Sequence, residues 1–178
     1  MRVIKTMDKK IVEKYRNIKA AAVKNFEKDG CLHFCFFSIV EMGDDLVASP
    51  IMIDPRNTEA FKQRQDIAFK VGRYIANEKH RKNHKVVAFM VVSEAWQSEQ
   101  PKDTKIENAM MPSEDPNRIE ILQFSIQDEK ENVYFETYKI LEKDGNRSID
   151  QKHGSFHKGA KAPLLDAMWK GYQGYVKV

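Results

Sequence analysis

The residues best suited to chemistry lie at the end of an apolar run, where Glu94 and Trp96 follow residues 86–92. Side chains alternate along a strand, so this carboxylate and this indole share one face. A carboxylate next to a buried strand needs a charged or hydrogen-bonding partner, because an unpaired buried charge is costly. We therefore expect the end of this strand to be paired with another segment of the chain.

A long polar connection, residues 98–117, leads to that segment. Connections of this length inside a compact domain are usually functional or mobile. If the next strand pairs antiparallel with the first, Arg118 and Glu120 return beside Glu94 and Trp96. Arg118 then either pairs with Glu94 or stacks on the Trp96 ring. Both a structural loop clamp and a ligand or partner site are consistent with the candidate residues Ser93, Glu94, Trp96, Ser113, Arg118 and Glu120.

The same residues carry a resemblance to a group of uncharacterised prokaryotic and phage proteins. In that group a Ser-Glu-Ala-Trp strand end is followed, after a variable loop, by Pro-Ser-Glu-His-Pro-Asp-Arg-x-Glu and a β-hairpin. The match spans roughly residues 86–142, with Asp115 in place of the His and Asn117 in place of the Asp. The resemblance implies the position of the site and the hairpin that follows it. The lost His argues against an acid–base or metal role for the loop.

Two thiols and an imidazole alternate at Cys31, His33 and Cys35, and these residue types bind zinc. Ligands spaced along one face of a flat strand do not converge easily on one ion, so we expect all three side chains to pack in the core. On one strand the two thiols lie roughly 13 Å apart, which is too far for a disulfide. Free thiols in a reducing compartment are the simplest interpretation.

Two histidine pairs have the i, i+4 spacing that can present two imidazoles to one metal. His80 and His84 are surrounded by basic residues, which repel a cation, whereas His153 and His157 lie in an irregular segment. We interpret both pairs as surface residues, with the second pair the better metal candidate. The chain has neither a Gly-x-Ser-x-Gly motif nor a glycine-rich phosphate loop. The sequence thus predicts no catalytic residue, no metal site and no cofactor.

Hydrophobic periodicity predicts the elements that position these residues. Residues 8–28 form an amphipathic helix, which Asp29-Gly30 ends. Pro50 confines the second of the predicted strands to a sheet edge or a bulge. The elements after the first helix are strands over 31–40 and 46–53, a helix over 58–80, strands over 85–97, 118–127 and 132–142, an irregular basic segment over 144–162, and a helix over 163–175.

We predict an α+β fold with the order α-β-β-α-β-β-β-α, in which a mainly antiparallel five-stranded sheet is packed with helices. The strand over 85–97 is apolar on both faces and therefore lies inside the sheet. The 178 residues suit one domain, 1–178. No apolar run is long enough to span a membrane, and the first ten residues contain no signal-peptide core. We expect a cytoplasmic protein without membrane contact.

Charge is distributed unevenly around a net value of +4. Residues 62–85 carry eight basic and two acidic side chains, whereas acidic residues outnumber basic ones over 94–150. This layout favours self-association or an anionic partner, although solvated helix faces have the same pattern. Tyr74 falls on the apolar stripe of helix 58–80 and not on its basic face. Contacts with a nucleic acid would come from Arg64, Arg73, Arg81, Lys82 and Lys85.

Because the sequence assembles no catalytic set, the favoured interpretation is a non-enzymatic, phage-related accessory or interaction protein. Its expected partner is another protein or a second copy of itself. Two alternatives remain open. One is a small-ligand-binding or hydrolase-like enzyme with its site at the end of strand 85–97, and the other is a nucleic-acid-binding protein that uses the basic face of helix 58–80.

Overall fold

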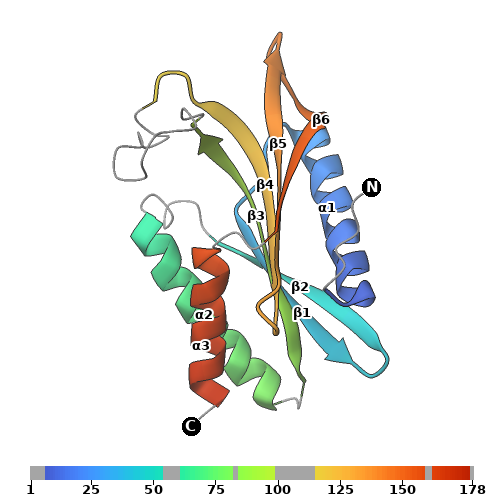
Figure 1. Ribbon diagram of the computed structural model, residues 1–178, viewed down its shortest axis with the longest axis vertical. Coiled ribbons are helices and arrows are strands. Elements are labelled where there is room, and N and C mark those ends of the chain that lie inside the picture. The colour runs from blue at the N-terminus through green and yellow to red at the C-terminus, as the bar shows by residue number, and fades with distance from the viewer. Residues whose placement is uncertain (1–6, 54–60, 82–83, 99–114, 159–161, 177–178) are drawn as a thin grey trace.

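The computed structural model describes residues 7–53, 61–81, 84–98, 115–158 and 162–176. They form an α+β fold in which an antiparallel sheet lies between helix α1 on one face and helices α2 and α3 on the other (Figure 1). The strand order across the sheet is β2-β1-β3-β4-β5-β6. The elements are α1 (Lys9–Asp29), β1 (Cys35–Met42), β2 (Asp45–Met52), α2 (Phe61–Arg81), β3 (Val86–Gln97), β4 (Ile119–Asp128), β5 (Val133–Lys143), β6 (Asn146–Lys158) and α3 (Pro163–Val176).

The predicted order of elements is confirmed except for one additional strand. Residues 144–162, which the sequence indicates to be irregular, contain β6, and β6 pairs antiparallel with β5. The prediction of five strands is therefore wrong, and the described residues form a sheet of six strands. β6 lies at a sheet edge and is mostly polar, so it lacks the apolar alternation by which strands are recognised.

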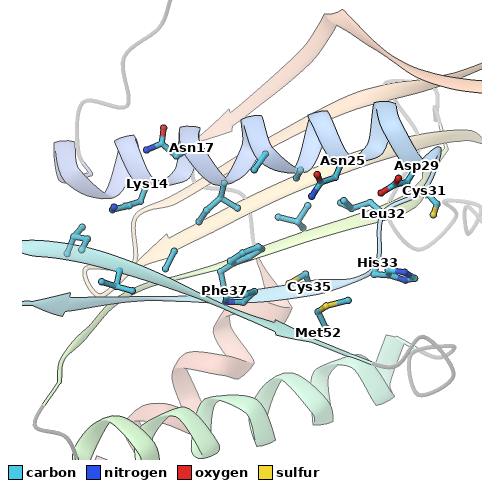
Figure 2. A pocket seen from close by; sticks show the side chains of 18 residues that line it. Lys14, Asn17, Asn25, Asp29, Cys31, Leu32, His33, Cys35, Phe37 and Met52 are labelled. Atoms are coloured by element: carbon cyan, nitrogen blue, oxygen red, sulfur yellow. The ribbon is translucent and has the colours of Figure 1, made fainter.

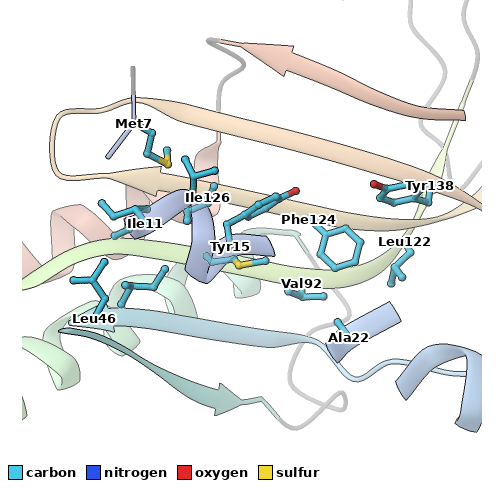
Figure 3. Packing of buried hydrophobic residues seen from close by; sticks show 14 of the residues in the cluster. Met7, Ile11, Tyr15, Ala22, Leu46, Val92, Leu122, Phe124, Ile126 and Tyr138 are labelled. Atoms are coloured by element: carbon cyan, nitrogen blue, oxygen red, sulfur yellow. The ribbon is translucent and has the colours of Figure 1, made fainter. Parts of the chain in front are cut away.

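Helix α1 has two ends that its sequence explains. The carboxylate of Asp8 accepts a hydrogen bond from the amide of Lys10 at 2.7 Å, as an N-cap does. Gly30 ends the helix with φ of 69°, a left-handed conformation that glycine adopts without strain. The buried side chains of α1 pack against the sheet, and they are Ile11, Val12, Tyr15, Ala22 and Phe26. Figure 3 labels three of them, Ile11, Tyr15 and Ala22.

Strand β3 lies inside the sheet, as predicted, and contributes to a core on each face. The α1 side receives Val87, Ala88, Met90 and Val92, and the opposite side receives Val86, Phe89 and Val91. The alternation of faces is thus as expected from Ala88 onward. The predicted faces of Val86 and Val87 are wrong, because the register between β1 and β3 shifts at this end of the strand.

Helices α2 and α3 cross at close range because a glycine of each faces the backbone of the other. A Cβ atom at Gly72 would lie 2.0 Å from the Met168 carbonyl oxygen, and one at Gly171 would lie 2.1 Å from the Phe69 carbonyl oxygen. The paired helices cover the sheet with a core that includes Trp169. Like α1, neither helix is long and apolar enough to span a membrane.

Strand β2 lies at the sheet edge, as Pro50 predicts. Ile53, just after the strand, donates its amide to the Phe34 carbonyl at 3.4 Å, toward β1. Inward and outward residues alternate in an antiparallel ladder, so the nitrogen of Pro50 is directed away from β1. The missing N–H group of proline therefore costs the sheet no hydrogen bond.

Candidate functional site

Arg147, at the start of β6, is the centre of a cluster with Glu94 and Glu120, two residues of the predicted clamp, although the prediction did not include Arg147. Its Nη2 atom lies 2.9 Å from Glu94 Oε2 on β3 and 2.8 Å from Glu120 Oε2 on β4. Its Nη1 atom donates to the carbonyl of Gly30, at the end of α1, at 2.7 Å. The guanidinium carbon also lies 5.3 Å from the centre of the Phe26 ring. One side chain therefore connects α1, β3, β4 and β6.

Both carboxylate oxygens of Glu94 have partners. Oε1 accepts a hydrogen bond from the amide of Leu32 at 2.5 Å, and Oε2 faces Arg147. Burial alone lowers the pKa of Arg147, but the hydrogen bonds to Glu94 and Glu120 raise it, and the net pKa is above its ordinary value. The sequence predicts Arg118 as one possible partner of Glu94. In the structure, the cation beside Glu94 is instead Arg147.

Trp96 and Arg118 form the outer part of the clamp. The guanidinium carbon of Arg118 lies 3.7 Å from the centre of the Trp96 ring, which is the predicted stack. The indole Nε1 donates to Glu120 Oε1 at 3.4 Å, and the strand register places Trp96 opposite Glu120. Trp96 is 45% exposed, so its ring covers the end of the sheet and does not fill the core.

Asp115 holds the returning segment in a tight turn. Its carboxylate accepts hydrogen bonds from the Ser98 hydroxyl and from the amide of Asn117, the latter at 2.8 Å. The hydrogen bond from Ser98 is the largest cause that lowers the pKa of Asp115, followed by the Asn117 amide. The residue that replaces the His of the resembled pattern is therefore a structural acceptor, which joins the two ends of the connection between β3 and β4.

A pocket of about 670 Å³ lies beside the clamp, between α1 and the β1–β2 hairpin (Figure 2). We call it the α1–hairpin pocket. Its lining is mainly apolar and includes Ile18, Ala21, Phe37, Leu46, Ala48 and Val92. Leu32 also lines it, and the amide of Leu32 is the group that Glu94 holds. The clamp therefore fixes the chain segment that forms one end of the pocket.

Cys31, His33 and Cys35 also line this pocket, and two of them contradict the prediction of core packing. Cys31 and His33 are exposed because they precede β1, which begins at Cys35. Both thiols are free, and burial raises the pKa of the half-buried Cys35. Within the part of the chain that the structure describes, no three His, Cys, Asp or Glu side chains are grouped so that they could hold a metal ion.

A second polar cluster lies between α1 and β5. Glu136 accepts hydrogen bonds from the Tyr15 hydroxyl at 2.6 Å, from Lys19 Nζ at 3.0 Å and from the Tyr138 hydroxyl. Burial, together with the charge of Glu136, raises the pKa of Tyr15 and Tyr138, and it raises the pKa of Tyr134 to about 12. The sequence pattern gives no sign of this cluster, because it joins residues more than a hundred positions apart.

Among the predicted nucleic-acid contacts whose side chains the structure describes, Arg64 and Arg73 do not share one face of α2. The guanidinium carbon of Arg64 lies 5.7 Å from the centre of the Phe34 ring, and Lys85 Nζ lies 2.7 Å from a carboxylate oxygen of Glu129. Arg73 is exposed on α2. It follows Arg64 by nine residues, or about two and a half helical turns, so the two residues lie on opposite sides of the helix.

Several predicted residues lie outside the described part of the chain. They are Ser113 of the predicted clamp, and Lys82 and the side chain of Arg81 of the predicted basic face. The side chains of His80, His153 and His157 are likewise not described. Ser93 is described and is buried on β3 next to Glu94.

No periodicity in the sequence indicates Arg147, because it belongs to the strand that pattern analysis overlooks. The turn before Arg147 provides a signal that could have revealed both Arg147 and the strand β6. Asp144 and Gly145 have φ of 53° and 76°, and an Asp-Gly pair with positive φ at both positions is a preferred two-residue hairpin turn. The turn brings β6 back along β5 with Arg147 opposite Glu142.

The chain was compared with family models, curated proteins and solved structures. No family model, curated protein or solved structure matches it. The resemblance to the Ser-Glu-Ala-Trp group of prokaryotic and phage proteins therefore stays a prediction. The interpretation of function rests on the pocket and the clamp.

Proposed function

We propose that this chain is a non-enzymatic accessory protein that binds a small, mainly apolar molecule in the α1–hairpin pocket. The observation that carries the proposal is the pocket itself. Its volume of about 670 Å³ lies in the range of about 300–1,000 Å³ that is usual for small-molecule sites, and its walls are mainly apolar, as in such sites. Apolar walls favour an apolar ligand because binding removes both surfaces from water.

The geometry of the clamp supports binding over catalysis. A general base must reach the proton that it abstracts. Both oxygens of Glu94 are already occupied, by Arg147 and by the Leu32 amide. Glu94 does not line the α1–hairpin pocket. We therefore assign the clamp a positioning role: it holds Leu32 and Gly30 in place at one end of the pocket.

Titration with Nile red, an uncharged dye that fluoresces in apolar surroundings, tests the proposal. The variant Ala21→Phe places a ring in the pocket, because Ala21 lines it from an exposed position on α1. The matched control is Ala20→Phe, which adds the same ring to an exposed neighbour that does not line the pocket. We expect saturable dye binding that Ala21→Phe weakens about tenfold or more and Ala20→Phe leaves unchanged. Equal affinity in both variants would place the dye elsewhere and contradict the proposal.

A second candidate function, nucleic-acid binding, is favoured by one observation on α2. Tyr74 is 62% exposed and Phe69 is 40% exposed, so the prediction that Tyr74 belongs to the apolar stripe is wrong. Their exposed neighbours are Lys70 and Arg73. Aromatic rings between basic side chains are the arrangement that stacks bases while neutralising phosphates.

Binding of a single-stranded oligonucleotide across a salt series tests this second candidate. We expect Tyr74→Ala to weaken binding at every salt concentration, and Arg73→Gln to reduce the slope of log affinity against log salt by about one. Lys139→Gln, an exposed change on β5, is the control. Absence of binding at low salt, or an affinity that does not depend on salt, would eliminate the nucleic-acid interpretation.

A further inference from the structure

We propose that the ligand of the α1–hairpin pocket is an anionic amphiphile, a linear apolar chain with a carboxylate head that pairs with Lys14. This inference rests on the proposed function and names the class of molecule that the pocket takes. The evidence is the position and environment of Lys14, the charge at the opposite end of the pocket, and the elongated shape of the apolar lining.

Lys14 lines the pocket from α1 and is half-buried. Among the described residues it has neither a hydrogen bond nor an ion pair. The preceding lysine on the same side of the helix, Lys10, instead donates to the carbonyl of Asp44 at 2.5 Å. A half-buried lysine without a partner is a favourable place for an anion, because its ammonium group can form a charge-assisted hydrogen bond with a carboxylate.

The opposite end of the pocket has a different charge. Asp29, the last residue of α1, lines it there together with Cys31 and His33 (Figure 2). Asp29 is the acidic side chain among these three; its exposed carboxylate lies 3.8 Å from Lys28 Nζ, and Lys28 does not line the pocket. Lys14 is the lysine that lines the pocket, so charge complementarity places the head group there and directs the chain toward the end that the clamp fixes.

The lining between the two ends suits a long chain. Lys14 and Asp29 are fifteen residues apart on one helix, which corresponds to about 22 Å along its axis. Ile18 and Ala22 line the pocket between them, facing Phe37 and Val92 of the sheet. An extended apolar chain contacts all four side chains, whereas a compact ligand would leave part of the lining uncovered.

Displacement of bound Nile red by dodecanoate and by dodecanol tests the head group, because the two ligands share a chain and differ in charge. We expect dodecanoate to bind more tightly than dodecanol to the unmodified protein. The variant Lys14→Met should weaken dodecanoate about tenfold and leave dodecanol unchanged, since a charge-assisted hydrogen bond is lost only with the anion. Lys14→Arg should retain tight dodecanoate binding. Lys24→Met is the control, because Lys24 is exposed on α1 and does not line the pocket.

The outcomes separate this inference from the function on which it rests. Equal displacement by dodecanoate and dodecanol, or equal effects of Lys14→Met on both, would overturn the assignment of the head group while leaving an apolar binding site. Failure of Nile red to bind the unmodified protein would overturn the binding function itself. Weaker dodecanoate binding in both Lys14→Met and Lys24→Met would indicate general attraction by a basic surface and would also overturn the assignment.

Discussion

Arg147 Nη2 lies 2.9 Å from Glu94 Oε2, although β4 and β5 separate the two strands that carry these residues. In a flat sheet, three strand spacings amount to about 14 Å, more than an arginine side chain can span. The contact therefore requires the sheet to curl on its α1 side. It also holds the curl in place, because the same side chain binds the carbonyl that ends α1.

Replacing Arg147 should test this role. We expect Arg147→Ala to lower the free energy of unfolding by about 2–3 kcal/mol, because it leaves the half-buried Glu94 carboxylate without its cation. Arg147→Lys should recover part of the loss, since it keeps the charge without the planar fork. Urea denaturation measures each value. The control Lys139→Ala changes an exposed side chain on β5 and should cost less than about 0.5 kcal/mol. If Arg147→Ala is as harmless as the control, the clamp does not stabilise the fold.

The two tryptophans should differ sharply in their contribution to stability. Trp169 is 7% exposed in the core under α2 and α3, so Trp169→Ala should cost about 3–5 kcal/mol. Trp96 is 45% exposed and is stacked on Arg118, so Trp96→Ala should cost only about 1 kcal/mol. Thermal unfolding of both variants provides the comparison. Similar losses of melting temperature would mean that the Trp96 ring is part of the core.

The close crossing of α2 and α3 predicts that alanine destabilises the fold at Gly72 but not at Gly174, which serves as the control. Gly72→Ala places a Cβ atom against the Met168 carbonyl and should destabilise the fold by about 3 kcal/mol or more. Gly174→Ala makes the same change on α3, where nothing lies within 4 Å of the new Cβ, and should stabilise it by about 0.5–1 kcal/mol. Chemical denaturation of both variants measures the difference. A neutral Gly72→Ala would show that the helices do not approach each other as closely as described.

The tyrosine cluster predicts a loss of stability at high pH. The pKa of Tyr15 and Tyr138 is raised by burial and by Glu136, and that of Tyr134 is raised to about 12, whereas tyrosines in the unfolded chain lose their protons near pH 10. Above about pH 10 the unfolded state therefore binds fewer protons than the folded state, and the free energy of unfolding falls as pH rises. The stabilisation that the protonated tyrosines contribute to the folded state is fully present below about pH 10.

Urea denaturation between about pH 8 and pH 12 measures this dependence. The variant Tyr15→Phe should cost about 1 kcal/mol at neutral pH, because it loses the hydrogen bond to Glu136, and its stability should fall less steeply at high pH. Identical slopes for the variant and the unmodified protein would exclude Tyr15 as a source of the alkaline loss.

Much of the fold could be predicted from the sequence because its main elements carry strong local signals. α1 has a regular apolar stripe between an Asp cap and a Gly stop, and β3 has apolar residues on both faces. β6 lacks such a signal, since an edge strand needs few buried side chains and only Ile149 of its first five residues is buried. Its pairing depends on the Asp144-Gly145 turn and on the neighbouring strand, and neither appears in an apolar pattern.

The candidate site could be predicted only in part, for a similar reason. β3 and β4 are consecutive strands that pair antiparallel, so the contact between Trp96 and Arg118 could be expected from the sequence. The partnership of Glu94 with Arg147 depends on the curl of the whole sheet, which no local pattern encodes. The α1–hairpin pocket is likewise a property of packing, because its walls come from elements that are separate in sequence.

Pro50 presents a nitrogen without a proton to the outer side of β2. A strand of another chain placed along this edge would lose a hydrogen bond in the middle of its pairing, so extension of the sheet into a second copy is disfavoured there. Since Pro50 also lines the α1–hairpin pocket, the residue that disfavours strand addition at this edge is at the same time part of the wall of the proposed binding site.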